Sequence, residues 1–168
     1  VTLPWEMYRH YGDQRILNES FPTIQRWLAF LETKSKQDML VRYGGNWGFL
    51  GDWQWPKFGG DRRDVEKLGK FLGDTRESLF FNNCCWIYNL DTAARIAEVI
   101  GEKEAADTYR KRASVVRAAV HTTFFNPADS SYVNGFPAYL AIALQADLPP
   151  KELRPAVWQR LEQEIMVK

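Results

Sequence analysis

The stretch Leu79-Phe-Phe-Asn-Asn-Cys-Cys-Trp-Ile-Tyr88 is apolar almost all the way round when it is drawn as a helix. A helix of this kind is buried on most of its sides. The pattern continues as one apolar stripe, so the sequence predicts a helix from about Ser78 to Ile100. Gly101 follows at the position where a left-handed residue commonly ends a helix. We therefore expect this helix to be covered by other helices.

Two kinds of helix alternate along the chain. The segments 78–88 and 137–145 are nearly all apolar, whereas 102–124 and 151–168 are amphipathic. No alternating stretch is long enough to build a sheet. This alternation predicts an all-α fold, a double-layered toroid of antiparallel helix hairpins with covered inner helices and solvated outer ones. A helical-repeat solenoid would alternate similarly, but the sequence has no fixed period to support it.

A further helix is predicted from about Gln14 to Lys36, after a break at Gly12 and Asp13. Pro22 lies inside it and should either kink the helix or begin its second half. Three tryptophans fall in helical apolar stripes and are expected in the core, namely Trp27, Trp86 and Trp158. Four basic side chains are expected on a solvated surface, namely Arg110, Lys111, Arg112 and Arg117.

An aromatic segment, residues 43–56, interrupts the helical pattern with three tryptophans, one tyrosine, one phenylalanine, four glycines and one carboxylate, Asp52. Glycine and proline at this density exclude a regular helix. Aromatic rings can stack on the C–H face of a sugar while a carboxylate accepts hydrogen bonds from its hydroxyls. The alternative is an Ω-loop that packs its own rings onto the helices beneath it.

Composition excludes several classes of function. The 22 basic and 21 acidic residues nearly cancel, and no basic stripe indicates a nucleic-acid partner. No apolar stretch approaches the ~20 residues of a membrane span. Cys84 and Cys85 are adjacent and read as small buried hydrophobes, with no disulfide or metal spacing. We find no nucleotide fingerprint or nucleophilic serine motif, and predict no cofactor and no metal.

The order of several segments resembles the catalytic domain of bacterial α-L-rhamnosidases, glycoside hydrolase family 78, which is an (α/α)6 barrel. The similarity spans nearly the whole chain. It lies in Tyr11-Gly-Asp-Gln-Arg-Ile-Leu17, the helix around Phe21-Pro22, Gly51-Asp-Trp53, the helix–turn–helix at residues 96–106, Arg117–Pro127 and Ser131-Tyr132. The resemblance implies the middle portion of such a barrel, as one segment, residues 1–168, truncated at both ends.

The resemblance implies that Asp52 and Trp53 line a carbohydrate site, followed by Trp47 and Trp55. It implies inverting hydrolysis of rhamnosides by an acid and a base that lie outside this segment, so the segment alone is predicted to be inactive. Asn82-Asn83 and Asn134-Gly135 could reach the same rim or serve only as local caps. The alternatives are another six-hairpin glycosidase, of the debranching type, or a non-catalytic helical scaffold. The compartment stays open between bacterial cytoplasm and periplasm.

Overall fold

The computed structural model describes residues 1–44, 49 and 75–166. The described elements are α1 (Thr2–Tyr11), α2 (Arg15–Glu32), β1 (Ser35–Lys36), β2 (Met39–Leu40), α4 (Arg76–Val99), α5 (Lys103–Phe124), β3 (Phe125–Asn126), β4 (Ser131–Tyr132), α6 (Pro137–Gln145) and α7 (Arg154–Met166). The strands form two antiparallel hairpins, β1–β2 and β3–β4. The all-α prediction is confirmed. None of the described helices is long and apolar enough to cross a membrane.

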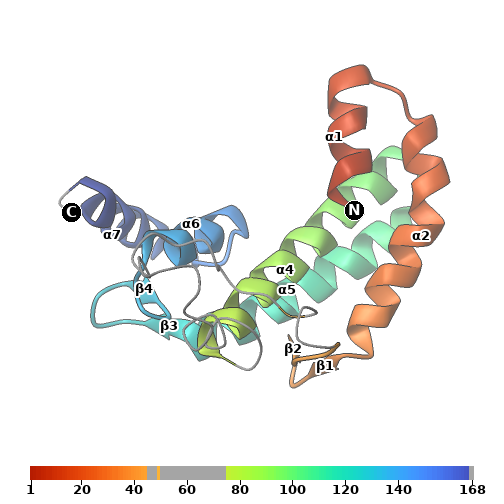
Figure 1. Ribbon diagram of the computed structural model, residues 1–168. Helices are drawn as coiled ribbons and strands as arrows, with labels where there is room; N and C mark the ends of the chain where they lie inside the picture. The colour runs from red at the N-terminus through yellow and green to blue at the C-terminus, as the bar shows by residue number, and fades with distance from the viewer. Residues whose placement is uncertain (45–48, 50–74, 167–168) are drawn as a thin grey trace, which may run out of the picture.

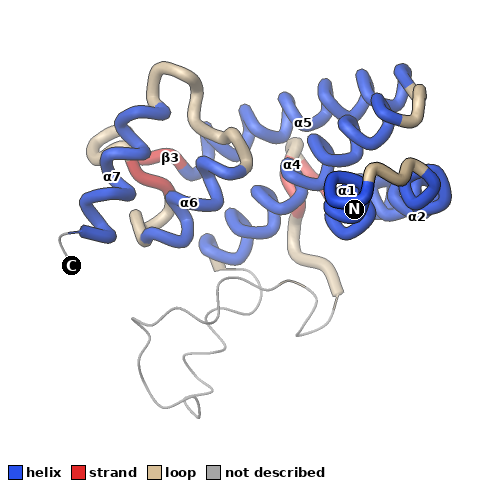
Figure 2. Tube along the Cα trace, turned by 90° about the horizontal axis from the view of Figure 1, so that it is seen from above, coloured by secondary structure: helices blue, strands red, loops and turns tan. Residues whose placement is uncertain are grey.

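The α4–α5 hairpin forms the central axis of the fold. Both views place α1 and α2 at one end of this pair and α6 and α7 at the other (Figures 1 and 2). The apolar helices α4 and α6 contact each other, while α5 packs on α4 and α7 packs on α6. This is the predicted alternation of covered and covering helices. It explains why the least polar sequence occupies α4 and α6.

Local chemistry sets both ends of α4. The Thr75 hydroxyl accepts a hydrogen bond from the backbone N–H of Ser78 at 3.1 Å, which caps the first turn. At the other end Gly101 has a φ of 88°. The N–H of Glu102 reaches the carbonyl of Ala97 at 2.8 Å, and that of Gly101 reaches Glu98 at 3.3 Å. This pair of bonds is a Schellman motif, so the expected role of Gly101 is confirmed.

The core follows α4 and gathers several aromatic rings. Phe80 lies 5.3 Å from Phe124, 5.5 Å from Tyr132 and 6.1 Å from Tyr139, measured between ring centroids. These rings come from α4, α5, β4 and α6, so one buried phenylalanine joins four elements. Trp86, also on α4, is 1% exposed, as predicted.

Two of the three tryptophans expected in the core are outside it. Trp27 is 40% exposed and Trp158 is 54% exposed. The buried stripe of α2 consists of Leu17, Phe21, Ile24, Leu28 and Leu31. Trp27 lies one residue beside this stripe, where its ring stacks on Phe30 at 5.7 Å. Trp158 lies beside the buried Val157, and its indole N–H donates to Glu162 at 2.9 Å.

The predicted helix 14–36 ends earlier than expected, at Glu32, although it runs through Pro22. Two hydroxyl groups satisfy the last carbonyls. Thr33 donates to the carbonyl of Phe30 at 2.7 Å, and Ser35 donates to that of Glu32 at 2.9 Å. Side-chain bonds of this kind compete with further helix. Gln37 and Asp38 then have φ values of 50° and 62°, as the tight turn between β1 and β2 requires.

Three of the four arginine and lysine side chains expected in solvent pair with other elements, and two of these three are partly buried. Arg112 binds both carboxylate oxygens of Glu32, at 2.9 and 2.7 Å, and Asp38 at 2.5 Å. Its guanidinium also lies 5.1 Å from the ring centre of Trp86. Arg117 pairs with Asp91 at 2.6 Å. The helical pattern could not show these partners because they lie on other elements. Arg110 and Lys111 are exposed, as predicted, although Arg110 also pairs with Glu98 of α4 at 2.5 Å.

Candidate functional site

The β1–β2 hairpin is attached to α4 by one buried amide. The Asn83 side chain accepts a hydrogen bond from the N–H of Leu40 at 2.7 Å and donates to the carbonyl of Leu40 at 3.1 Å. It also donates to the carbonyl of Leu79 at 2.8 Å. In the β1–β2 hairpin, Leu40 lies opposite Ser35. The residues beyond this pair, Lys34 and Val41, are joined by a hydrogen bond from the Val41 N–H to the Lys34 carbonyl. Hydrogen-bonded and non-hydrogen-bonded residue pairs alternate along an antiparallel ladder. The backbone N–H and carbonyl of Leu40 therefore point away from β1, and the Asn83 side chain binds both of them.

This result decides between two interpretations of Asn83. Its exposed fraction is 1%, and its carbonyl and amide both hold backbone groups of this chain. A side chain used in this way is not available to a substrate. Asn83 therefore has a structural role, and the interpretation in which it reaches a sugar is not supported. Its neighbour Asn82 donates to the carbonyl of Ser78 at 2.8 Å. The exposed Asn134 accepts a hydrogen bond from the N–H of Phe136 at 3.2 Å, which is the geometry of a local cap.

A cavity of about 600 Å³ lies where this hairpin meets the start of α4 and the end of α5. Its walls include Lys36, Gln37, Met39, Val41, Arg76 and Phe124. The Arg76 guanidinium donates to the carbonyl of Thr123 at 2.8 Å and lies 4.9 Å from the ring centre of Phe124. The volume is within the range of small-molecule sites. We call it the hairpin cavity.

Two residues that line the hairpin cavity, Val41 and Arg76, lie before and after residues 43–74, the stretch that contains the aromatic segment. Val41 lines the cavity two residues before Tyr43, where the aromatic segment begins. Arg76, another lining residue, follows the N-cap residue Thr75, where the described chain resumes. The four predicted site residues, Asp52, Trp53, Trp47 and Trp55, lie outside the described residues. The sequence also predicts a short helix over residues 65–71, and this span lies outside the described residues as well.

Two rings of the aromatic segment are described, and both pack inward. Tyr43 lies 5.6 Å from Phe30 of α2 and 5.7 Å from Phe49, between ring centroids, with the rings edge-on. Phe49 is 1% exposed. Burial also raises the pKa of the Tyr43 hydroxyl above its ordinary value. These two rings thus anchor part of the segment to α2, as the Ω-loop alternative predicts for them.

The adjacent cysteines are not nucleophiles. Both are free, and Cys84 is fully buried. Burial raises the pKa of the Cys85 thiol to about 11 and that of the Cys84 thiol well above its usual value. A thiol must lose its proton to react, so neither is reactive near neutral pH. The interpretation of Cys84 as a small buried hydrophobe is confirmed, whereas Cys85 is half-buried.

His121 has partners that the sequence analysis missed. Its Nδ1 atom lies 2.7 Å from the Tyr132 hydroxyl, and its ring stacks on Phe125 with centroids 4.7 Å apart. From its place near the end of a predicted helix, the sequence predicts only a surface or capping role for His121. Two features of the sequence could have indicated these contacts. His121 lies four residues before Phe125, and the turn at residues 126–131 brings Phe125 opposite Tyr132. Burial lowers the pKa of His121 below its ordinary value of 6.5, which favours the neutral ring.

Comparison with known proteins gives the family. The bacterial alpha-L-rhamnosidase 6 hairpin glycosidase domain matches residues 1–168, and the chain belongs to this family. An alpha-L-rhamnosidase of Formosa agariphila is 27% identical over 165 residues, which are 98% of this chain and 16% of that protein. The chain therefore spans a small part of this relative.

Solved structures agree with the family. The Streptomyces avermitilis alpha-L-rhamnosidase complexed with L-rhamnose superposes with a TM-score of 0.74 and 25% identity, over 99% of this chain and 14% of that one. The alpha-L-rhamnosidase from Dictyoglumus thermophilum gives 0.74 and 21% identity, over 99% and 17% of the two chains. The second shares the fold. The predicted α/α six-hairpin architecture is thereby confirmed.

Proposed function

We propose that this chain is a segment of the catalytic barrel of a glycoside hydrolase that releases terminal L-rhamnose with inversion. The observation that carries the proposal is the hairpin cavity, whose walls include Val41 and Arg76, which lie before and after residues 43–74, the stretch that contains Asp52 and Trp53. In this proposal, Trp53, Trp47 and Trp55 stack on the sugar, and Asp52 accepts hydrogen bonds from its hydroxyl groups. The match to α-L-rhamnosidases supports rhamnose as the sugar.

The chemistry requires groups from beyond this segment. Inverting hydrolysis needs two carboxyl groups about 6.5–9.5 Å apart, one to protonate the leaving oxygen and one to activate water. No aspartate or glutamate is among the described residues that line the hairpin cavity. Asp52 alone cannot supply both roles. We therefore place the acid and the base in other parts of a longer polypeptide, and assign binding and positioning to this segment.

The test compares two proteins on an aryl α-L-rhamnoside. A full-length polypeptide containing this segment should release the aryl group, whereas the 168-residue chain alone should not. Clear turnover by the 168-residue chain would contradict the assignment of acid and base to other segments. Turnover of a different aryl glycoside by the full-length protein, with none of the rhamnoside, would favour the debranching-type alternative.

A second candidate function is a helical scaffold in which the aromatic segment only packs. The inward packing of Tyr43 and Phe49 favours it for those two rings. The two functions differ in what Trp53→Ala does to the full-length protein. A scaffold role predicts a lower melting temperature with an unchanged KM, and a sugar-binding role predicts a raised KM.

A further inference from the structure

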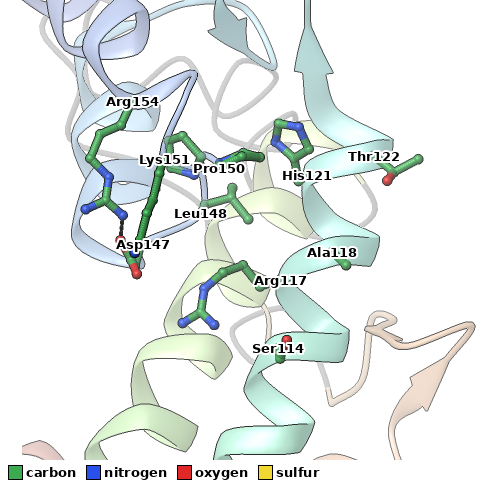
Figure 3. Close-up of a pocket in the computed structure, with 11 residues that line it drawn as sticks. Ser114, Arg117, Ala118, His121, Thr122, Asp147, Leu148, Pro150, Lys151 and Arg154 are labelled. Atoms are coloured by element: carbon green, nitrogen blue, oxygen red, sulfur yellow. Dashed lines mark ion pairs between the residues drawn. The ribbon is translucent and has the colours of Figure 1, made fainter.

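A second cavity, of about 380 Å³, lies between α5 and the connection from α6 to α7. Figure 3 shows Arg117 and His121 reaching into it from α5, with Asp147, Lys151 and Arg154 on the opposite side. We call it the α5–α7 cavity. It shares no lining residue with the hairpin cavity. Its volume is enough for a small ligand.

The charges around the α5–α7 cavity are unequal. Three permanently basic side chains line it, and Asp147 is the one carboxylate among the described lining residues. Asp147 is already paired with Arg154. Arg117 is paired with Asp91, which lies outside the lining. Lys151 has no hydrogen-bond or ion-pair partner among the described residues. The cavity therefore retains positive charge after its internal pairs are formed.

The two arginines keep donors available despite these pairs. A guanidinium carries five N–H donors. Arg117 uses Nη2 for Asp91 and Nε for the carbonyl of Ala146 at 3.2 Å, which leaves Nη1 without a partner in the described chain. Arg154 uses Nη2 for Asp147. Guanidinium groups with spare N–H donors bind carboxylate and phosphate oxygens strongly.

The α5–α7 cavity has a defined backbone on the α6–α7 side and a held histidine on the α5 side. The N–H of Leu148 bonds to the carbonyl of Ala143 at 2.9 Å, and Asp147 has a φ of 54°, so the end of α6 has a defined left-handed turn. Leu148 is 1% exposed, and two prolines follow it. On the other wall, His121 is held by Tyr132 through Nδ1, so Nε2 is the ring nitrogen left for a ligand. Backbone and side chains that are already ordered lose little entropy when a ligand binds.

We propose that the α5–α7 cavity binds a small oxyanion, a carboxylate or phosphate group, through Arg117, Lys151 and Arg154. Ser114 and Thr122 of α5 also line this cavity. The site has no described lining residue in common with the hairpin cavity, and the proposal does not depend on the proposed function. Its ligand is defined by charge and acceptor oxygens, whereas L-rhamnose is neutral.

The test is a titration of the 168-residue chain near neutral pH, followed through the His121 imidazole signals in NMR spectra. Inorganic phosphate and acetate are added separately, and L-rhamnose serves as the neutral comparison. We expect a saturable shift with at least one anion, and the anion that gives it identifies the preferred group. No saturable shift with either anion, or the same shift with L-rhamnose, would overturn the proposal.

A matched pair of variants separates the cavity from the general charge of the protein. Lys151→Ala removes the unpaired charge from the cavity, and Lys111→Ala removes one exposed charge from α5 away from it. Loss of one charge close to the anion should weaken binding about fivefold. We expect this loss for Lys151→Ala and unchanged affinity for Lys111→Ala. Equal effects of the two substitutions would show non-specific attraction and contradict a built site.

Discussion

Replacing Asn83 by alanine removes the side chain that joins the β1–β2 hairpin to α4. Asn83 makes three hydrogen bonds, two of them to the N–H and carbonyl of Leu40. Leu40 is 3% exposed, so water does not easily replace the lost amide. An unsatisfied buried polar group costs about 1–3 kcal/mol. Asn83→Ala leaves the N–H and the carbonyl of Leu40 without partners. Allowing for some local relaxation, we expect the free energy of unfolding to fall by ~2–4 kcal/mol.

Asn18→Ala is the matched control. Asn18 is also a helical asparagine, and its amide likewise donates to the carbonyl four residues earlier, that of Gln14, at 3.0 Å. It is exposed, however, and holds no group on another element. Alanine is also the better helix former. We expect Asn18→Ala to change the free energy of unfolding by no more than about 0.5 kcal/mol.

The assay is urea and thermal unfolding of both variants, followed by far-UV circular dichroism. For a chain of this length, 1 kcal/mol corresponds to about 2–4 °C in Tm. Asn83→Ala should therefore melt several degrees below Asn18→Ala. If the two variants lose equal stability, the amide does not hold the hairpin, and the reasoning about Leu40 is refuted.

Three further predictions concern contacts elsewhere in the fold. Arg112→Met should cost about 1 kcal/mol at low ionic strength and less in high salt; an effect independent of salt in urea titrations would contradict the ion-pair network. Trp86→Ala should cost ~3–5 kcal/mol, whereas Trp158→Ala should cost less than about 1 kcal/mol; similar losses would mean that the burial of the two rings is wrongly assigned. Burial lowers the pKa of His121 below 6.5, so the unfolded chain takes up its proton at a higher pH than the folded one. The contribution of His121 to the free energy of unfolding should therefore be fully present above pH 6.5 and should decline as the pH falls below that value. His121→Gln retains a polar group beside Tyr132 and should make the free energy of unfolding less dependent on pH below 6.5. The measurement is the urea midpoint as a function of pH, and the same slope in the variant as in the original chain would contradict the prediction.

The sequence predicted the elements that depend on local patterns. Residues 137–145 form α6 as expected, and Gly101 ends α4 with the expected left-handed turn. Each signal lies within one or two turns of the chain, where periodicity and caps act. The covered character of the first half of α4 was also predictable, because no side of residues 78–88 is consistently polar.

The remaining features depend on partners far apart in the chain. Asn83 finds Leu40 across 43 positions, and Arg112 finds Glu32 across 80. A single sequence carries no signal for such pairs, so Asn83 was left open and Arg112 was wrongly placed in solvent. Trp27 was wrongly placed in the core because it lies three residues after Ile24 and four before Leu31, a spacing that also fits the buried stripe of α2. The four residues expected to bind sugar lie outside the described residues, so their role stays a proposal.

The most direct test of the sugar-binding proposal is the KM of a full-length polypeptide for an aryl α-L-rhamnoside after substitution in the aromatic segment. Trp53→Ala and Asp52→Asn should each raise KM, because stacking and hydroxyl contacts are lost. Trp158→Ala, an exposed tryptophan on α7, should leave KM unchanged. An unchanged KM in both aromatic-segment variants, with folding intact, would contradict the proposal that this segment holds the sugar.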